Sequence, residues 1–248
     1  MNSRSISIVI MAAGKGTRMM SDIPKVIHKI AGKTLLNHVI NTSIKLNPEH
    51  IVVVVGYKAD KVQESVNEKT IKFSLQRDQK GTAHAVIQTK EHLEKFQGHT
   101  LVLSGDVPLI HHKTLETLIK KQINENLSAS VLTADFEDPT GYGRVIRDDD
   151  DNLKKIKEHK DCSDEQLKIK EINSGIYIFN NELLFRLLPK IENNNAQSEY
   201  YLPDVLTMIV ENKGRIGLEK INDITEIQGI NTNDQLLNLE KEFKNRNQ

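Results

Sequence analysis

The sequence predicts an α/β protein built on a Rossmann-like, doubly wound and mostly parallel mixed sheet. Two observations lead to this fold class. Short runs of β-branched and aliphatic residues, typical of strands buried on both faces, alternate with segments in which apolar residues recur at helical spacing. The chain has 248 residues, which is enough for one large core of several layers. Strands that alternate with helices favour a parallel sheet with helices on both of its faces.

The first half of the chain follows this alternation. The opening strand is predicted at residues 6–11, and residues 51–55 form an unbroken β-branched run typical of a central strand. Further strands are expected at 71–75, 101–103 and 129–133, and helices at 34–46, 59–66, 81–93 and 114–123. Because ligands of doubly wound proteins bind at the carboxyl ends of the strands, we expect the site along that edge.

The second half is less regular. A turn-rich segment, 138–143, leads into a hairpin whose strands are expected at 144–146 and 153–156, with the acidic run 148–151 as its turn. Other strands are expected at 171–179, 216–218 and 227–230, and helices at 182–188, 205–209 and 234–243. Pro203 suits the first turn of the helix at 205–209.

Composition limits the classes of function. Lys plus Arg and Asp plus Glu are both 34, so charge gives no general reason to expect binding to nucleic acid or to a membrane. No apolar stretch reaches the roughly 18 residues of a spanning helix, and the N-terminus lacks a signal-peptide pattern. The single cysteine, Cys162, cannot form an internal disulfide. We therefore expect a cytoplasmic protein with one domain over residues 1–230 and a C-terminal helix within 231–248, and leave its oligomeric state open.

The segment after the first strand, residues 12–19, is expected to bind phosphate groups. Its two alanines and two glycines leave the backbone N–H groups open to a ligand. Lys15, Arg18 and Lys25 add three cations close together in the sequence. A strand that opens into a small, basic, glycine-bearing loop is typical of a polyphosphate site, and the alternative is an exposed strand-to-helix turn.

Two familiar phosphate motifs do not fit this region. The dinucleotide fingerprint requires a third glycine where this chain has Met19. The ATPase phosphate loop requires a glycine where the chain has Ile27, ahead of the Gly-Lys-Thr at 32–34. A hydride-transfer cofactor and an ATPase-type loop are therefore not expected.

Two oxygen-bearing side chains are candidate Mg²⁺ ligands. Asp106 follows a predicted strand, Ser104 and Gly105, at a point where phosphates could complete an octahedral site. Asn231 follows the strand expected at 227–230 and offers an amide oxygen. The alternative for each is a cap of the helix that comes after it.

Gln76 and the pair Gly81–Thr82 are candidate contacts to a nucleobase. Gln76 ends a predicted strand, and its carboxamide offers one donor and one acceptor to a base edge. Gly81 and Thr82 open a predicted helix, whose unpaired N–H groups can face an anion or a base carbonyl. The nine histidines show no metal-ligand spacing, so zinc chemistry is not expected.

Further segments extend the pattern along nearly the whole chain. They are 12–19 with 21–22 and 24–25, Gln76, 81–82 with 84–85, 105–110, 138–144, 158–161, 171–173, 193–197 with 199–201, and 229–231. Together they resemble the uridylyltransferase domain of the bacterial bifunctional enzymes that make UDP-N-acetylglucosamine. The opening loop alone indicates only the wider nucleotidyltransferase superfamily, and the later segments separate the amino-sugar enzyme from its relatives.

This resemblance implies a nucleotide-diphospho-sugar transferase fold, with a nucleotidyltransferase domain over 1–230. It also implies Mg²⁺-dependent transfer of UMP from UTP to N-acetylglucosamine 1-phosphate, which gives UDP-N-acetylglucosamine and pyrophosphate. The residues implied for the nucleotide are Met11, Ala12, Ala13, Gly14, Lys25, Gln76, Gly81 and Thr82. Those implied for the amino sugar are Ser104, Gly105, Gly143, Glu158, Asn173 and Asn231. Arg18, Lys25 and Asp106 would be catalytic, and Asp106 and Asn231 would hold Mg²⁺.

Three features depart from the family pattern. Ser104 stands where the family usually has a tyrosine, which alters a wall of the expected sugar pocket. Ala83 replaces a frequent glycine beside the nucleotide. After the last predicted helix the sequence shows no hexapeptide pattern, so a left-handed β-helix with acetyltransferase activity is not expected in these residues. Two alternatives stay open: a related enzyme that joins UTP or dTTP to a hexose 1-phosphate, and a UDP-sugar-binding module without catalysis.

Overall fold

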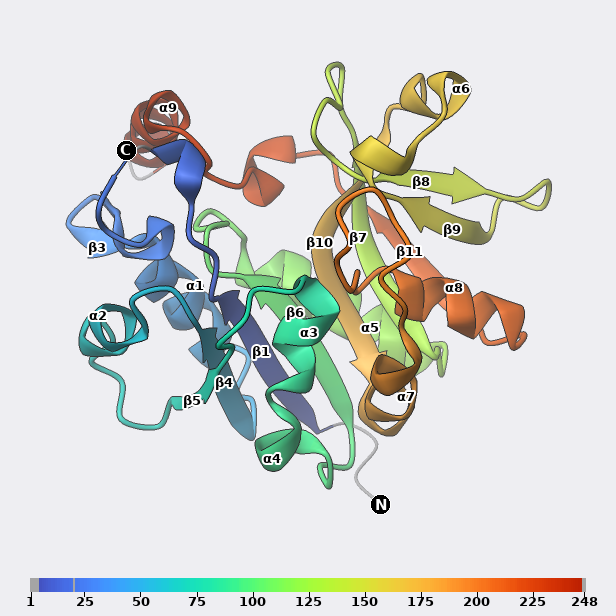
Figure 1. Ribbon diagram of the computed structural model, residues 1–248, viewed down its shortest axis with the longest axis horizontal. Helices are drawn as coiled ribbons and strands as arrows, with labels where there is room; N and C mark the ends of the chain where they lie inside the picture. Colours follow the sequence, from blue (N-terminus) through green and yellow to red (C-terminus); the bar gives the residue numbers. More distant parts are fainter. Residues whose placement is uncertain (1–4, 20, 247–248) are drawn as a thin grey trace.

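The computed structural model describes residues 5–19 and 21–246, and its core is a mixed sheet with helices on both faces (Figure 1). Within the described residues this sheet has nine strands, with the continuous order β11-β7-β10-β6-β1-β4-β5. The strands on this path are β1 (Ile6–Ala12), β4 (His50–Val55), β5 (Lys72–Leu75), β6 (His99–Ser104), β7 (Ala129–Asp135), β10 (Glu171–Asn180) and β11 (Ile216–Lys220). β8 (Arg144–Arg147) and β9 (Leu153–Lys157) form a hairpin attached through β10.

Most neighbouring strands of the path are parallel. β1 pairs in parallel with β4 and β6, β4 pairs with β5, and β11 pairs with β7. β10 is antiparallel to both of its neighbours, β6 and β7. The predicted fold class, a mostly parallel mixed sheet, is therefore confirmed. The predicted hairpin is confirmed as well, because β8 and β9 pair antiparallel across the acidic turn.

The core lies on both faces of the sheet. Along β1, Ile8 and Ile10 belong to one hydrophobic cluster and Val9 to the other, as expected for side chains that alternate along a strand. The helices are α1 (Leu35–Ile44), α2 (Ala59–Glu64), α3 (Thr82–Ile87), α4 (Lys90–Leu93), α5 (His112–Asn124), α6 (Asp164–Leu167), α7 (Asn181–Leu187), α8 (Asp204–Glu211) and α9 (Asn233–Arg246). α1, α2 and α5 supply apolar residues to the first cluster, and α3, α4, α7 and α8 to the second. Both faces of the central strands are covered, which explains their unbroken apolar runs.

Two predicted elements need correction. The helix expected at 81–93 is divided into α3 and α4, and the Thr89 hydroxyl donates a hydrogen bond of 2.7 Å to the Val86 carbonyl at the break. The strand expected at 227–230 is wrong. Ile227 ends the 3-10 helix η5 (Ile224–Ile227), and it is buried in a different cluster from Ile230. The apolar pattern there comes from a loop that packs against two clusters, not from strand pairing.

The C-terminal helix α9 lies beside the segment that follows β1. Leu239 of α9 is buried in a small cluster with Met19, Ile30 and Leu35. α9 contacts β2 (Lys29–Ile30), and Figure 1 shows it at the end of the sheet toward which the carboxyl end of β1 points. This packing brings the chain between η5 and α9 to the edge of the sheet where the basic loop lies.

Candidate active site

The basic loop fixes the base of the Lys25 side chain. Gly16 has a φ of +63°, and a Cβ at this position would lie 2.6 Å from Lys25 Cβ. Only glycine accepts both the left-handed backbone and this close approach. Lys25 begins the 3-10 helix η2 (Lys25–Ile27), and its carbonyl accepts a hydrogen bond of 3.2 Å from the His28 amide. The backbone and Cβ of Lys25 are therefore held in place, whereas the stem beyond Cβ retains several rotatable bonds.

Asp106 reaches the same region through the pairing of β1 with β6. The Gly105 amide donates a hydrogen bond of 2.9 Å to the Met11 carbonyl, just beyond the end of β6. This bond continues the parallel register of the two strands and places Asp106 beside the loop. The carboxyl ends of β1 and β6 thus bring the basic loop and Asp106 to the same edge of the sheet, where the site is predicted.

Four predicted residues converge at this edge and form what we call the Lys25 cluster: Arg18, Lys25, Asp106 and Asn231. The Lys25 Nζ lies 2.5 Å from Asp106 Oδ2 and 3.0 Å from Asn231 Oδ1. Arg18 Nη2 donates a hydrogen bond of 2.9 Å to the same Asn231 oxygen. The side chains of Lys25 and Asp106 are only 17% and 16% exposed. Lys25 and Asp106 are thus largely shielded from solvent, whereas Arg18 reaches Asn231 from the exposed side of the cluster.

Asn231 is held there by its backbone. The Ile230 amide donates a hydrogen bond of 3.1 Å to the Asp106 carbonyl. The Asn231 amide donates one of 2.7 Å to Gln235 Oε1, from the first turn of α9. Asn231 therefore reaches the cluster from a loop, and the strand predicted before it is not required.

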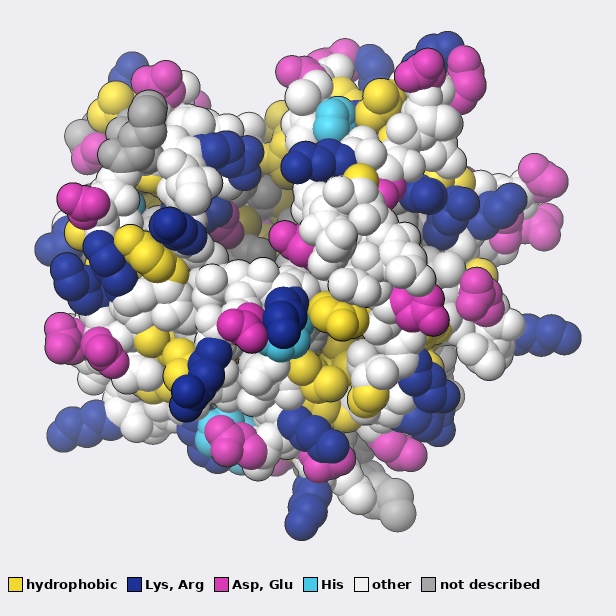
Figure 2. All heavy atoms as spheres, in the orientation of Figure 1, with side chains coloured by type: hydrophobic (Ala, Val, Ile, Leu, Met, Phe, Trp, Pro, Cys, Tyr) yellow, Lys and Arg dark blue, Asp and Glu magenta, His cyan; other side chains and the backbone are white. Residues whose placement is uncertain are grey.

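Two cavities open beside the Lys25 cluster, and they share Met11, Thr82 and Ser104 in their walls. The larger has a volume of about 290 Å³ and is lined by the loop, Gln76 and Gly81, among others. The smaller has a volume of about 180 Å³ and is lined by Gly143, Glu158 and Asn173, among others. Figure 2 shows the molecular surface hollowed in the upper middle of the view, between the parts that carry α9 and β8.

The predicted residues separate between these two cavities. All eight that were assigned to the nucleotide line the larger cavity: Met11, Ala12, Ala13, Gly14, Lys25, Gln76, Gly81 and Thr82. Of those assigned to the sugar, Ser104, Gly143, Glu158 and Asn173 line the smaller one. Gly105 is buried beneath the junction, and Asn231 lies in the Lys25 cluster. Among the described residues that line the smaller cavity, Gly105 and Asn231 are therefore absent, although both were predicted to bind the sugar.

The wall of the larger cavity is built around Gln76. Its side chain is buried, and Nε2 donates a hydrogen bond of 3.1 Å to the Gly81 carbonyl and lies 3.0 Å from His84 Nδ1. These contacts fix the plane of the carboxamide. Gly81 has a φ of +109°, and a Cβ there would lie 2.5 Å from the Tyr200 carbonyl oxygen. The segment with Tyr200 is thus packed directly onto the start of α3.

The wall of the smaller cavity depends on backbone contacts between β10 and the turn before β8. The Asn173 amide donates a hydrogen bond of 2.8 Å to the Gly143 carbonyl. The Asn173 side chain donates one of 2.7 Å to the Tyr177 hydroxyl, across an irregularity in the register of β10. A Cβ on Gly143 would lie 3.3 Å from Glu158 Oε1, so the glycine leaves the carboxylate open to the cavity.

Glu158 is an acid in a strongly perturbed environment. Burial and, to a smaller extent, the negative charges of Asp161, Asp204 and Glu199 together raise its pKa to about 7. The pKa of Asp204 is also raised, to about 6, by burial and by Asp161. A carboxyl group with a pKa near neutrality, on the wall of a cavity, is typical of a functional site.

Several wall residues were not predicted from the sequence. In the larger cavity they include Gln79, Ala85 and Glu199, and in the smaller one Tyr142, Ser174, Gly175, Tyr177 and Pro203. Tyr177 lies in the middle of the long apolar strand β10, and the apolar pattern of that strand indicated only core packing. Ala85, Glu199 and Tyr142 lie in segments that carry the family resemblance, which could have marked them, whereas nothing in the sequence distinguishes Gln79, Ser174, Gly175 or Pro203 as wall residues.

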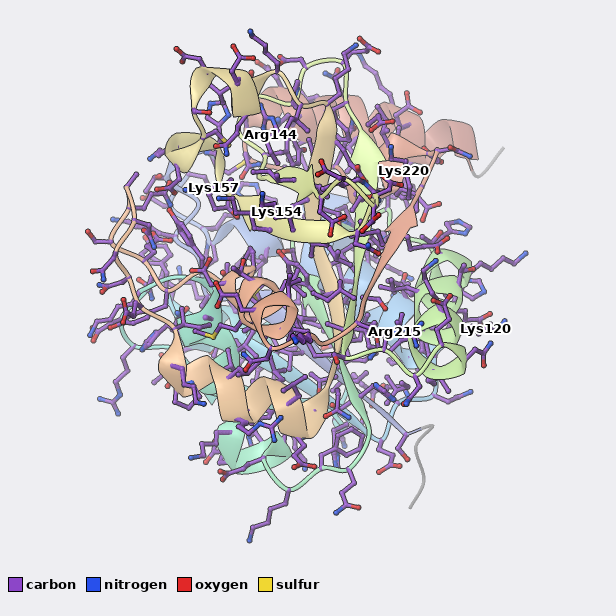
Figure 3. The ribbon with its side chains drawn as sticks, turned by 90° about the vertical axis from the view of Figure 1, so that its right-hand side faces the viewer. Lys120, Arg144, Lys154, Lys157, Arg215 and Lys220 are labelled. Carbon is purple, nitrogen blue, oxygen red and sulfur yellow. The ribbon has the colours of Figure 1, made fainter. Side chains whose placement is uncertain are left out.

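Charge on the two faces in view is mixed. Figure 2 shows Lys and Arg side chains interspersed with Asp and Glu side chains. Figure 3 shows that labelled cations on the adjacent side, such as Lys120, Lys154 and Lys220, come from separate elements. Lys220 is paired with Asp135 at 2.9 Å. On these faces the charges do not gather into one broad basic surface.

Within the residues that the structure describes, no group of three or more His, Cys, Asp or Glu side chains could hold a metal ion. Asp106 and Asn231 contribute only one carboxylate and one amide to the Lys25 cluster. In the same residues no helix has both the length and the apolar composition needed to cross a bilayer.

Comparison with known proteins establishes the class. The chain belongs to the nucleotidyl transferase family, whose sequence model matches residues 7–235. The fold agrees: the crystal structure of UDP-glucose pyrophosphorylase complexed with UDP-glucose superposes with a TM-score of 0.77, covering 98% of this chain and 99% of the other at 16% identity.

The similarity is much higher to one kind of family member. The chain is 46% identical over 238 residues to the bifunctional protein GlmU of Streptococcus uberis and 47% identical over 241 residues to that of Alkaliphilus metalliredigens. These matches cover 96% and 97% of this chain but 52% of each relative, so the chain spans about half the length of the curated relatives that it matches. The resemblance drawn from the sequence segments is therefore confirmed.

Proposed function

We propose that this chain transfers UMP from UTP to N-acetylglucosamine 1-phosphate, with Mg²⁺, to give UDP-N-acetylglucosamine and pyrophosphate. The observation that carries the proposal is the meeting of two cavities at Met11, Thr82 and Ser104, beside the Lys25 cluster. Such an arrangement suits two substrates whose phosphates meet at the junction. The similarity to proteins named bifunctional protein GlmU supports the same choice of substrates.

The larger cavity is proposed to hold UTP. The side chain of Gln76 has the chemistry to read a uracil edge, and its contacts with Gly81 and His84 hold it in one orientation. The backbone of 11–14 would accommodate the base and ribose, because Ala12, Ala13 and Gly14 carry at most a methyl group. Arg18 and Lys25 would bind the triphosphate and neutralise the charge that develops as pyrophosphate leaves.

The Lys25 cluster fits Mg²⁺ by its donor chemistry. Asp106 Oδ2 and Asn231 Oδ1 both lie within hydrogen-bond distance of one ammonium nitrogen, so these two hard oxygen atoms already face a common cationic centre. Mg²⁺ usually takes one or two protein ligands and completes its octahedron with phosphates and water. When bound, the ion would neutralise phosphate charge and help to align the reacting groups.

The smaller cavity is proposed to hold the amino sugar. Glu158 and Asn173 present a carboxylate and an amide, which suit the hydroxyl and N-acetyl groups of N-acetylglucosamine. The sugar phosphate oxygen would attack the α-phosphate of UTP in line. A general base is not required because a phosphate monoester is already anionic near neutral pH, so positioning and charge neutralisation carry the rate.

Two alternative functions would use the site differently. The second candidate is a related transferase that joins UTP or dTTP to a hexose 1-phosphate. It is favoured by Ser104, a small residue that lies in the walls of both cavities. A UDP-sugar-binding module without catalysis is less well supported, because it would not need the convergence of Arg18, Lys25, Asp106 and Asn231. We further propose that residues 1–230 form the nucleotidyltransferase domain and that the segment 231–248 is an appended helix.

A pyrophosphate-release assay tests the proposed function. It compares N-acetylglucosamine 1-phosphate with glucose 1-phosphate, each with UTP and with dTTP, in the presence and absence of Mg²⁺. We expect the highest kcat/KM with UTP and the N-acetylated sugar, and no release without the metal. A preference for glucose 1-phosphate would support the second candidate, and no release with any pair would support the binding module.

A further inference from the structure

In this structure the Lys25 ammonium occupies the position between the two proposed metal ligands. Its Nζ lies 2.5 Å from Asp106 Oδ2 and 3.0 Å from Asn231 Oδ1. Resting on the proposed function, we infer that Lys25 and a divalent metal ion compete for these two oxygen atoms. The metal binds well only when the ammonium has moved away. Lys25 is thus a built-in control on metal binding as well as a phosphate ligand.

Competition follows from charge and distance. Mg²⁺ binds oxygen ligands at about 2.0–2.1 Å, closer than the ammonium lies now. If both cations kept these oxygens, a dication and a monocation would lie within a few ångström of each other. Arg18, on the same Asn231 oxygen, would add a third positive group. Because the Lys25 and Asp106 side chains are mostly shielded from solvent, salt would screen this repulsion only weakly.

The structure also provides a path for the ammonium to leave. The close approach of Gly16 holds the Lys25 Cβ and backbone, so only the stem beyond Cβ has to rotate. Lys25 lines the larger cavity together with Ala12, Ala13 and Gly14, so a rotated ammonium can reach the space proposed for the triphosphate. Phosphate oxygens there would give it a new anionic partner. Nucleotide and metal should therefore bind with positive coupling, since each favours the same position of Lys25.

The test measures Mn²⁺ binding without nucleotide, by the loss of the free-ion EPR signal, so that catalysis is not the readout. We expect Lys25→Met to bind Mn²⁺ about tenfold more tightly than the wild-type chain, because the competing cation is gone. Asp106→Asn should lose this binding. Lys58→Met is the matched control, because Lys58 lies in the neighbouring loop, over the ring of Tyr57 and hydrogen-bonded to the Asp22 carbonyl, away from the two oxygens.

The outcomes separate the inference from the proposed function. Equal Mn²⁺ affinity of Lys25→Met and wild type, with binding lost in Asp106→Asn, would overturn the competition and keep the metal site. Unchanged binding in Asp106→Asn would instead refute the metal site itself. If Lys25→Met does not fold, the ¹³Cε signal of Lys25, assigned with Lys25→Arg, is followed during Mg²⁺ titration of the wild-type chain. The signal should shift, and a signal that stays unmoved at saturation would contradict the inference.

Discussion

The Ile230 amide donates a hydrogen bond of 3.1 Å to the Asp106 carbonyl, and this single contact joins two segments that lie far apart in the sequence. It sets Asn231 next to the carboxylate that follows β6. The Lys25 cluster therefore depends on a loop-to-loop contact at the edge of the sheet. Because the cluster and the two cavities are formed by largely different side chains, substitutions in each should have separable effects.

Replacing Asp106 by alanine should remove turnover while leaving much of the affinity for the UDP-sugar product. The carboxylate is proposed to act through the metal, which matters most where charge develops in the transition state. We expect kcat to fall by about 10²–10³-fold or more, and the product Kd to change by less than about tenfold. Pyrophosphate release and calorimetric binding measure the two quantities. Asp135→Ala, which removes an exposed carboxylate paired with Lys220, is the control, and normal turnover in Asp106→Ala would refute the metal assignment.

The affinity for the sugar phosphate should depend on pH through the ionisation of Glu158. Its pKa is raised to about 7, so the carboxylate is the main form only above neutrality. As the acceptor for sugar hydroxyl and N–H groups, the ionised form should bind better. We expect KM for the sugar phosphate to rise as the pH falls from 8 to 6, measured at saturating UTP. In Glu158→Gln this dependence should disappear, and its persistence would assign the titration to another group.

Glu158→Gln should also raise the free energy of unfolding at pH 8. A carboxyl group whose pKa is higher in the folded than in the unfolded chain favours folding when it is protonated, and this contribution is lost as the pH rises through about 7. Glu158→Gln removes the buried charge, so we expect a gain of about 1–3 kcal/mol in unfolding free energy at pH 8 and little gain at pH 4. Urea unfolding at both pH values measures this. Glu165→Gln, at an exposed position, should show no such difference, and equal gains for Glu158→Gln at both pH values would contradict the raised pKa.

Gly143→Ala should weaken sugar binding without affecting the nucleotide. The added methyl group would lie 3.3 Å from Glu158 Oε1 and 3.4 Å from Ile156 Cγ2, which narrows the smaller cavity but requires only small shifts. We expect KM for the sugar phosphate to rise by about tenfold, the effect of about 1.4 kcal/mol, with KM for UTP unchanged. Initial rates with each substrate varied in turn decide this. A parallel rise of both KM values would show that the methyl group disturbs the junction of the cavities instead.

Gln76→Ala should raise KM for UTP and reduce discrimination between uracil and other bases. The carboxamide is buried and bound to the Gly81 carbonyl, so its loss removes both a base contact and a support of the loop before α3. We expect KM for UTP to rise by at least about tenfold, with a smaller rise for CTP. Rates with the two nucleotides give the comparison. Equal losses for both would show that Gln76 supports the loop without reading the base.

The fold could be predicted from the sequence to a large extent because its signals are local. Unbroken β-branched runs such as 51–55 indicated strands buried on both faces, and the hairpin around 148–151 was marked by its own turn residues. The strand predicted at 227–230 was wrong because the apolar pattern there reflects contacts with distant segments and not a local strand. Ile227 and Ile230 are apolar because they pack into two separate clusters, and a pattern in one short segment does not show which partners bury it.

For the site, the sequence by itself determined the chemistry: a small basic loop after a buried strand, a carboxylate after another, and the amides of Gln76 and Asn231. These follow from residue types at the ends of recognisable elements. Only the tertiary structure decided that Lys25 bridges Asp106 and Asn231, that two cavities meet at Ser104, and that Glu158 is buried among other acids. Distances, cavity walls and pKa shifts all arise from contacts between segments that are distant in the chain, which no local pattern encodes.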